Sequence, residues 1–316
     1  MLLNPDQGRG QPIKKLLLFN ETIAIIIRMK PLRIAQISDF HFTNITWNPL
    51  RLFSKRFLGN LNWIFKRKNA FSDESLEALP SLLSTLQLDW IFLGGDFTTT
   101  ALPEEYQKAK DFVGALPTPW IAIPGNHDHY TAGAYKQKRF YQSLANPSPS
   151  LFGLETHGVE AHQLTPQWWV VAMDTALATN LYSSRGLFSN TQEANLQKLL
   201  ALLPKDSSIL LFNHYPFFQN DVPRHSLDRG DALEALVRKE PRIKAYLHGH
   251  SHRHTIADLQ ASGLPIILDS GSAAEQDKAT WNLLTIDDQK LQIDVFRWKK
   301  TGWKLSNTEQ IPWIER

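Results

Sequence analysis

The chain of 316 residues contains no cysteine. This absence excludes disulfide bonds, zinc–thiolate sites, iron–sulfur clusters and a cysteine nucleophile. A metal ion bound by this chain would take His, Asp, Glu, Asn or backbone oxygen ligands, which favours divalent ions of hard to intermediate character. With 42% hydrophobic and 21% charged residues, the composition is typical of a globular protein. It excludes a disordered chain, a collagen-like repeat and a bundle of membrane helices.

The chain also lacks an uninterrupted run of the ~18 apolar residues that a membrane-spanning helix requires. Residues 16–27 are apolar but contain Asn, Glu and Thr, and no signal-peptide cleavage site follows them. Met29 directly precedes the expected first strand, so we expect translation to begin there. Residues 1–28 would then be an upstream misreading or a loose extension, with a weak membrane-surface anchor as the alternative. The lack of a clear export signal predicts a cytoplasmic protein.

Acidic residues are absent from residues 44–72, which contain six basic ones: Arg51, Lys55, Arg56, Lys66, Arg67 and Lys68. Apolar side chains recur in this segment at helical spacing, at Leu50, Phe53, Phe57, Leu61 and Ile64. One interpretation is a basic, apolar lid that engages an anionic amphiphile or the inner membrane surface peripherally. The other is an additional helix that packs on the body of the protein with its lysines in solvent.

The remaining chain alternates short apolar runs with amphipathic stretches, which is typical of an α/β protein. We expect strands at residues 32–38, 90–94, 120–124, 168–173, 209–212, 244–247, 265–268, 283–286 and 291–298. We expect helices at 75–86, 104–116, 191–203 and 231–239, with a break at Pro80 and with Asn190 as an N-cap. No repeat or long linker is visible, so residues 29–316 are predicted to form a single domain with an insertion at 44–72.

Polar side chains follow six of the expected strands. They are Asp39 and His41, then Asp96, then Asn126, His127 and Asp128, then Asp174, then His214, and finally His250 and His252. Because ligand sites of open α/β sheets form at the carboxyl ends of the strands, we expect these groups to build one site. Two carboxylates, one amide and four imidazoles suffice to hold two metal ions. Two divalent ions about 3.5–4 Å apart suit the displacement of a phosphoryl group.

These residues form five motifs in one order: Asp39-x-His41, Gly95-Asp96, Gly125-Asn126-His127-Asp128, His214, and Gly249-His250-x-His252. The set resembles the five signature blocks of the calcineurin-like metallophosphoesterases. The resemblance implies the fold of that family, a four-layer α-β-β-α sandwich of two facing mixed sheets.

The resemblance also implies a role for each residue. Asp39, His41 and His252 would hold the first metal ion, and Asn126, His214 and His250 the second. Asp96 would bridge both ions. His127 would be the catalytic residue, which does not bind metal but protonates the leaving alkoxide after a metal-bridging hydroxide attacks phosphorus. We expect two Mn²⁺ ions, with Fe²⁺, Zn²⁺ or Co²⁺ as alternatives.

The residues after Asp96 indicate which branches of the family this chain resembles. The protein Ser/Thr phosphatases carry Val-Asp-Arg-Gly there, whereas this chain has Phe97-Thr98-Thr99-Thr100. The motifs are more similar to the phosphodiesterase and lipid-precursor pyrophosphatase branches. We therefore expect hydrolysis of a phosphodiester or pyrophosphate bond in an amphiphilic, lipid-linked or nucleotide-linked substrate. The alternatives are a soluble cyclic-nucleotide or other small phosphodiesterase, a nuclease, and a non-catalytic scaffold. No nucleic-acid or protein partner is predicted.

Other polar residues near the motifs receive weaker expectations. His129, His248 and His254 are candidates for supporting the metal ligands or for binding the substrate. Arg185 and Arg224 are candidates for binding a phosphate group. We expect Asp128 to have a structural role and Asp174 to be part of a turn. We expect surface positions, or positions with ordinary hydrogen-bond partners, for His157, His162 and His225.

Overall fold

The computed structural model describes residues 30–44, 73–180, 183–219 and 221–315. Contacts between Cα atoms divide the chain into two units, Met1–Pro31 and Leu32–Arg316. All strands and helices with described bounds lie in the second unit. Residues 1–28 and nearly all of the basic insertion lie outside the described residues, so the expectations for both segments stay predictions. Within the described ranges, no helix combines the length and the apolar character needed to cross a membrane.

One mixed sheet has six strands in the order β15-β14-β13-β1-β2-β3. Three of these strands are parallel to one another: β1 (Leu32–Ile37), β2 (Trp90–Leu93) and β3 (Trp120–Ala122). An antiparallel meander continues from β1 through β13 (Thr280–Ile286), β14 (Lys290–Lys299) and β15 (Gly302–Pro312). The C-terminal part of the chain therefore extends the sheet that its N-terminal strand begins.

A second mixed sheet has seven strands in the order β11-β12-β10-β8-β6-β5-β4. Its four central strands are parallel: β12 (Ile266–Asp269), β10 (Ile243–His248), β8 (Ser208–Phe212) and β6 (Trp168–Met173). The edges are antiparallel: β11 (Thr255–Asp258), β5 (Val159–Gln163) and β4 (Leu151–Gly153). Two short parallel strands, β7 (Gly186–Leu187) and β9 (Leu227–Asp228), pair separately.

The two sheets face each other across an apolar layer, which joins Ile34 and Phe92 of one sheet to Phe212 and Leu247 of the other. The rings of Phe92 and Phe212 stack with their centroids 5.4 Å apart. Burial of these side chains on the inner faces drives the two sheets together.

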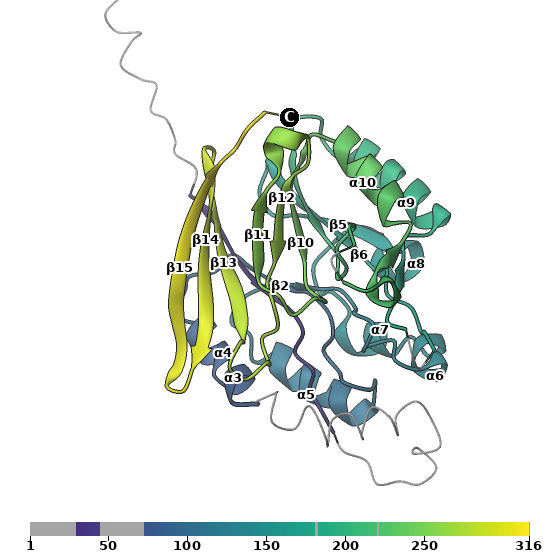
Figure 1. Cartoon of the computed structure of the whole chain (residues 1–316), viewed down its shortest axis with the longest axis vertical. Helices are drawn as coiled ribbons and strands as arrows, with labels where there is room; N and C mark the ends of the chain where they lie inside the picture. The colour runs from purple at the N-terminus through teal and green to yellow at the C-terminus, as the bar shows by residue number, and fades with distance from the viewer. Residues whose placement is uncertain (1–29, 45–72, 181–182, 220, 316) are drawn as a thin grey trace, which may run out of the picture. The chain divides into compact units, whose positions relative to one another are not determined.

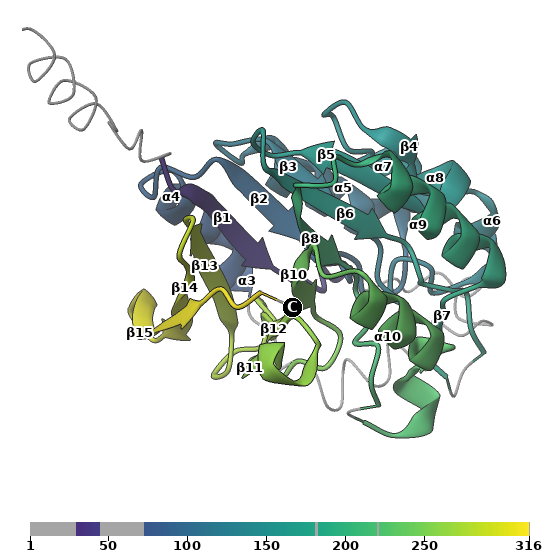
Figure 2. The same ribbon diagram turned by 90° about the horizontal axis from the view of Figure 1, so that it is seen from above.

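Helices cover the outer face of each sheet. The six-stranded sheet packs against α3 (Asp73–Glu77), α4 (Leu79–Leu83), α5 (Pro103–Gly114), α6 (Ala132–Lys136) and α7 (Arg139–Leu144). The seven-stranded sheet packs against α9 (Asn190–Leu202) and α10 (Gly230–Lys239), which lie side by side (Figures 1 and 2). One further helix, α8 (Leu154–His157), and two 3₁₀ turns, η2 (Pro223–His225) and η3 (Gln260–Ser262), complete the described elements. The expected four-layer α-β-β-α sandwich is confirmed.

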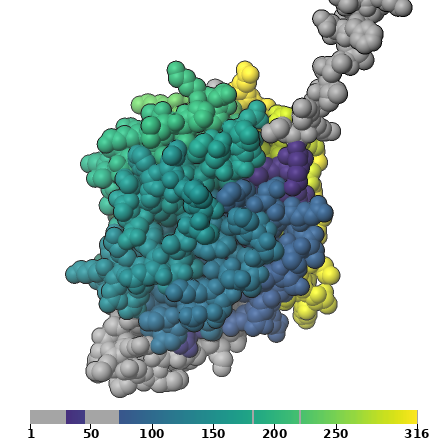
Figure 3. All heavy atoms as spheres, turned by 180° about the vertical axis from the view of Figure 1, so that it is seen from behind, coloured from purple at the N-terminus to yellow at the C-terminus, as the bar shows by residue number. Residues whose placement is uncertain are grey.

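The space-filling view from behind shows how the middle of the chain covers one face (Figure 3). Blue and teal segments occupy most of this face, and the yellow C-terminal strands appear only along its edge. Strands β4 to β6 and helices α5 to α8 all come from this middle part of the chain, between residues 103 and 173.

All nine expected strands are present, and the four expected helices are present with one change. Residues 75–86 form two helices, α3 and α4, and the interruption is at Ala78, with Pro80 inside the first turn of α4. The prediction of Asn190 as an N-cap is wrong, because Ser189 accepts the hydrogen bond from the Gln192 amide. Gln192 in turn accepts from the Ser189 amide, which completes a capping box.

Candidate functional site

The loops that follow four strands are hydrogen-bonded to one another. The Asp39 amide donates to the Gly95 carbonyl at 3.0 Å, and the His41 amide donates to the Asp96 carbonyl at 2.8 Å. The Gly249 amide donates to the His214 carbonyl at 3.1 Å. These bonds join the loops after β1 and β2, and those after β8 and β10. Side chains far apart in the sequence are thereby brought to one place.

The backbone of these loops adopts an uncommon conformation. Five of the expected site residues have φ angles between 50° and 69°, in the left-handed region: Asp39, His41, Asp96, His250 and His252. Such angles are unusual for residues other than glycine and persist only where the surroundings enforce them. The turn after each strand therefore aims these side chains at the cost of local strain.

Two glycines permit the close approach of the loops. A Cβ atom on Gly125 would overlap the Asp96 carboxylate, and a Cβ on Gly249 would overlap the side chain of Ser38. Both positions therefore exclude any larger residue without movement of the site. This accounts physically for the glycine that precedes Asn126 and the one that precedes His250.

Asp128 ties two of the loops together. Its buried carboxylate accepts hydrogen bonds from the amides of Phe97 at 3.2 Å, Thr98 at 3.0 Å and Gly125 at 3.0 Å. Burial, with the nearby charge of Asp96, raises the pKa of Asp128 to about 6. The structural role expected for Asp128 is confirmed.

Asp39, His41 and His252 form a first cluster of ligand-type atoms. The Nε2 atoms of His41 and His252 lie 3.0 Å apart, and His252 Nε2 lies 3.2 Å from Asp39 Oδ1. The other carboxylate oxygen, Asp39 Oδ2, accepts from Ser38 Oγ at 2.5 Å and from the His250 amide at 3.0 Å. One side of the Asp39 carboxylate is therefore held by the protein, while Oδ1 points to the two imidazoles.

Asp96, His214 and His250 form a second cluster. His214 Nδ1 lies 2.7 Å from the Gly94 carbonyl, and His250 Nε2 lies 2.8 Å from the His225 carbonyl. Because a carbonyl only accepts, each of these nitrogens carries a proton, and the other ring nitrogen is the one that a metal ion could take as a ligand. His214 Nε2 lies 3.6 Å from Asp96 Oδ2 and has no hydrogen-bond partner in the described part of the chain.

The charges of the second cluster are strongly coupled. Burial alone would raise the pKa of the Asp96 carboxyl, but the charges of His214 and His127 outweigh it and hold that pKa well below its usual range. Burial alone would lower the pKa of His214, but Asp96 raises it to about 9. Burial, with the charge of His214, lowers the pKa of His250 to about 3. The centre of the site therefore holds carboxylate charge in a buried place, which favours a bound cation.

Asn126 directly precedes His127, whose amide donates to Asp96 Oδ1 at 2.8 Å. It is buried, and its Oδ1 lies 3.5 Å from the hydroxyl of Tyr215. Tyr215 is also buried, and its ring centroid lies 4.4 Å from that of His250. Its hydroxyl donates to the Ser184 carbonyl at 2.9 Å, which fixes the ring between Asn126 and His250.

His127 lies next to both clusters. Its ring is edge-on to His41 at 4.8 Å, and a ring nitrogen falls within one ligand group with His41 and Asp96. Its Nδ1 lies 2.7 Å from the Thr99 carbonyl and therefore carries a proton. Nε2 is left for chemistry at the site. The structure thus gathers six of the seven expected ligands, together with His127, in overlapping groups of ligand-type atoms.

The sequence interpretation missed several residues around the clusters. The side chain of His225 is at a surface position paired with Asp221, as expected, but its backbone carbonyl also accepts from His250. Tyr215 could have been noticed because it follows His214 directly. Glu275, whose carboxylate lies 3.6 Å from His252 Nδ1, carries no signal in the sequence.

The residues with weaker expectations have individual surroundings. His248 Nδ1 lies 3.4 Å from Asp269, and His254 Nε2 lies 2.8 Å from Asn282 Oδ1. Arg185 is held by Asp228 at 3.0 Å and by the Pro223 carbonyl at 2.9 Å. Its guanidinium is therefore engaged in the loop between β7 and β9.

Comparison with known proteins adds a family and a fold. The family profile described as Calcineurin-like phosphoesterase matches residues 32–254. A 3′,5′-cyclic-nucleotide phosphodiesterase of Nostoc sp. is 23% identical over 234 residues, 71% of this chain and 72% of the relative. The 3′,5′-cyclic adenosine monophosphate phosphodiesterase CpdA of Escherichia coli is 25% identical over 207 residues, 64% of this chain and 66% of the relative.

A third relative is the glycerophosphodiester phosphodiesterase GpdQ of Enterobacter lignolyticus, 24% identical over 171 residues, 53% of this chain and 57% of the relative. The chain thus spans less than two thirds of the length of CpdA and of this GpdQ. A solved dimetal phosphatase of Danio rerio superposes with a TM-score of 0.64 at 14% identity, over 90% of this chain and 99% of the other. The purple acid phosphatase PPD1 of yellow lupin gives a TM-score of 0.62 at 12% identity, over 90% and 54%. At these identities the two structures show a shared fold.

Proposed function

The chain belongs to the calcineurin-like phosphoesterase family, and from this premise and the site geometry we propose that it hydrolyses phosphodiester or pyrophosphate bonds with two divalent metal ions. The first ion would be held by Asp39, His41 and His252, and the second by Asn126, His214 and His250. Asp96 would be a ligand of both ions. The observation that carries the proposal is the convergence of six of these side chains, all except Asn126, in two adjoining and largely buried clusters.

The donor atoms fit divalent metal ions. Asp39 Oδ1 and His214 Nε2 are buried and have no hydrogen-bond partner among the described residues. In the same side chains, Asp39 Oδ2 is hydrogen-bonded to Ser38 and His214 Nδ1 to the Gly94 carbonyl. Buried polar atoms without partners are costly, and a coordinated cation would satisfy them. Carboxylate, amide and imidazole ligands suit Mn²⁺, which we propose as the resident ion. When bound, such ions attract a phosphate and lower the pKa of a water molecule.

His127 is proposed as the general acid. The Thr99 carbonyl fixes the proton on Nδ1 and the orientation of the ring, so Nε2 is the atom that faces the reacting group. A protonated Nε2 would deliver its proton to the leaving alcohol oxygen, a step that typically contributes ~10²–10⁴-fold to the rate. The amide of His127 donates to Asp96 Oδ1, which ties the position of the acid to the metal centre.

The substrate class is proposed from the relatives. Those described above are named for cyclic nucleotides and for glycerophosphodiesters, which are small phosphodiesters. We therefore favour a small phosphodiester, with a cyclic nucleotide as the first candidate. A lipid-linked substrate, contact of residues 44–72 with a membrane, and a cytoplasmic location stay predictions. A nuclease remains the alternative that a strong dependence of DNA binding on salt would reveal.

The experiment starts with the purified chain, stripped of metal by a chelator and then given Mn²⁺. Turnover of bis(p-nitrophenyl) phosphate, a diester, is compared with turnover of the monoester p-nitrophenyl phosphate. We expect turnover that depends on metal and prefers the diester. Asp96→Asn should abolish it, whereas Asp111→Asn on the exposed side of α5 should not change it. Equal turnover with and without metal would refute the proposal.

A further inference from the structure

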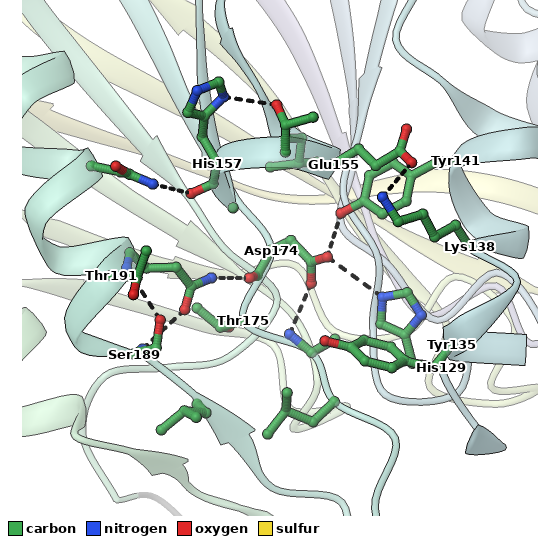
Figure 4. Close-up of a pocket in the computed structure, with 18 of the residues that line it drawn as sticks. His129, Tyr135, Lys138, Tyr141, Glu155, His157, Asp174, Thr175, Ser189 and Thr191 are labelled. Atoms are coloured by element: carbon green, nitrogen blue, oxygen red, sulfur yellow. Dashed lines mark hydrogen bonds and ion pairs between the residues drawn. The ribbon is translucent and has the colours of Figure 1, made fainter. Parts of the chain in front are cut away.

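One hollow of the described structure is lined by residues next in the chain to the site motifs. It has a volume of about 500 Å³ and is enclosed by the loop after β6, by helices α6 to α8 and by the start of α9 (Figure 4). Pockets of about 300–1,000 Å³ are typical of sites for small molecules. None of the seven expected ligands lines this pocket.

Asp174 lies at the centre of the pocket (Figure 4). Its Oδ1 accepts from the Ala176 amide at 3.0 Å, and its Oδ2 accepts from the hydroxyl of Tyr141. Its carbonyl oxygen accepts from the side chain of Gln192. An ionised carboxylate accepts about four hydrogen bonds, so the Asp174 carboxylate retains capacity for a ligand that carries N–H or O–H groups.

His129 lies against Asp174 and is 1% exposed. Its Nε2 lies 3.5 Å from Asp174 Oδ2, and neither ring nitrogen has a hydrogen-bond partner among the described residues. The ring of Tyr135 is edge-on to it at 4.9 Å. A buried imidazole without hydrogen bonds is costly in a folded protein, and a polar ligand in the pocket would remove that cost.

Several residues that line the pocket are linked to the metal centre through the chain or through a hydrogen bond. His129 lies in the same turn as His127, which precedes it by two residues. Thr175, which lines the pocket, donates from Oγ1 to Asn213 Oδ1 at 2.8 Å, and Asn213 directly precedes His214. Strands β6 and β8 are parallel neighbours, so the loops after them lie at one edge of the sheet. The turn at Asp174 and the loop that carries His214 are therefore neighbours.

We propose that the pocket binds the uncharged part of the substrate, an alcohol component rich in O–H or N–H donors such as a nucleoside or a polyol. Asp174 and His129 are its hydrogen-bonding partners. The carboxylates of Asp174 and Glu155 balance the charges of Lys136 and Lys138 in the lining, so the pocket has no excess positive charge to draw a phosphate from the metal centre. This inference rests on the proposed function and adds to it the part of the site that selects the substrate.

Two variants test the pocket. Thr191→Trp places a large side chain at an exposed position of α9 that lines the pocket, and Asp174→Asn removes the charge while keeping the shape. The KM for 3′,5′-cyclic AMP or for glycerophosphocholine should rise about tenfold or more in both variants, in Asp174→Asn because a hydrogen bond to a charged group is lost and in Thr191→Trp because the pocket is filled. The KM for bis(p-nitrophenyl) phosphate, which has no such donors, should rise less than the KM for the natural-type substrate that responds. Whichever natural-type substrate responds identifies the source of the alcohol.

The matched control is Gln197→Trp, an exposed position on the same helix that does not line the pocket. Its KM values should equal those of the unaltered chain, and a thermal melt of each variant checks the fold. Equal KM values for cyclic AMP and glycerophosphocholine in the Thr191→Trp and control variants would overturn the inference.

A binding measurement separates this inference from the proposed function. Saturation-transfer NMR on the full chain, without added manganese, uses adenosine and glycerol as probes that lack phosphate. At least one probe should bind to the unaltered chain and to Gln197→Trp, and should lose its signal with Thr191→Trp. No binding of either probe, or equal binding to all three proteins, would refute the pocket even if diester hydrolysis were established. Binding without diester turnover would instead refute only the function.

Discussion

At the scale of single residues, the site depends on strained backbone. Five of the seven expected ligands have left-handed φ angles, each at a cost of order 1–3 kcal/mol. The hydrogen bonds of Asp128, Ser38 and the carbonyls of Gly94 and His225 offset this cost by fixing the loops and the imidazoles. The fold itself therefore fixes the orientation of each side chain, as expected for a preorganised centre.

The role of His127 gives a prediction at this scale. His127→Ala should lower kcat for bis(p-nitrophenyl) phosphate by ~10²–10⁴-fold, because it removes the proton donor. Metal content, measured by elemental analysis, should stay the same, because His127 is proposed not to bind metal. Added imidazole should restore part of the rate. Loss of a metal ion in this variant would show that His127 is a ligand, and full turnover would show that it has no role in proton transfer.

The residues of the site were predictable because their types and order form dense motifs. The sequence could not supply their surroundings. Tyr215 and Glu275 reach the clusters through the packing of loops, and Asp174 and His129 meet in a pocket whose walls come from separate segments. These contacts depend on tertiary structure, so no short sequence pattern predicts them.

At the scale of helices and strands, buried elements were predictable and exposed or short ones were not. Central strands such as β6 and β10 are continuous apolar runs. In contrast, β15 has an exposed, mostly polar sequence at the edge of its sheet, and it forms by pairing with β14. Helices α6, α7 and α8 have four to six residues, too few to show a helical period.

The start of α9 gives a prediction at this scale. Ser189→Ala should lower the free energy of unfolding by about 1 kcal/mol, because it removes the side chain that caps the helix. Asn190→Ala is the matched control, since Asn190 is exposed and lies inside the first turn. It should leave stability nearly unchanged, as measured by urea denaturation. The opposite order of the two effects would mean that Asn190 is the cap after all.

At the scale of the whole unit Leu32–Arg316, the two sheets act together. The six-stranded sheet supplies Asp39, Asp96 and Asn126 from the loops after its parallel strands, and the seven-stranded sheet supplies His214 and His250 from its own. Each candidate cluster contains groups from both sheets. The apolar layer between the sheets, which includes the stacked Phe92 and Phe212, therefore fixes the relative position of the two halves of the site.

The central claim is that these side chains hold two metal ions together. It is tested most directly by crystals of the chain grown with Mn²⁺ and measured at wavelengths on both sides of the manganese absorption edge. The account predicts two anomalous peaks about 3.5–4 Å apart, one beside Asp39, His41 and His252, the other beside Asn126, His214 and His250, with Asp96 contacting both. A single peak, or peaks away from these residues, would contradict it.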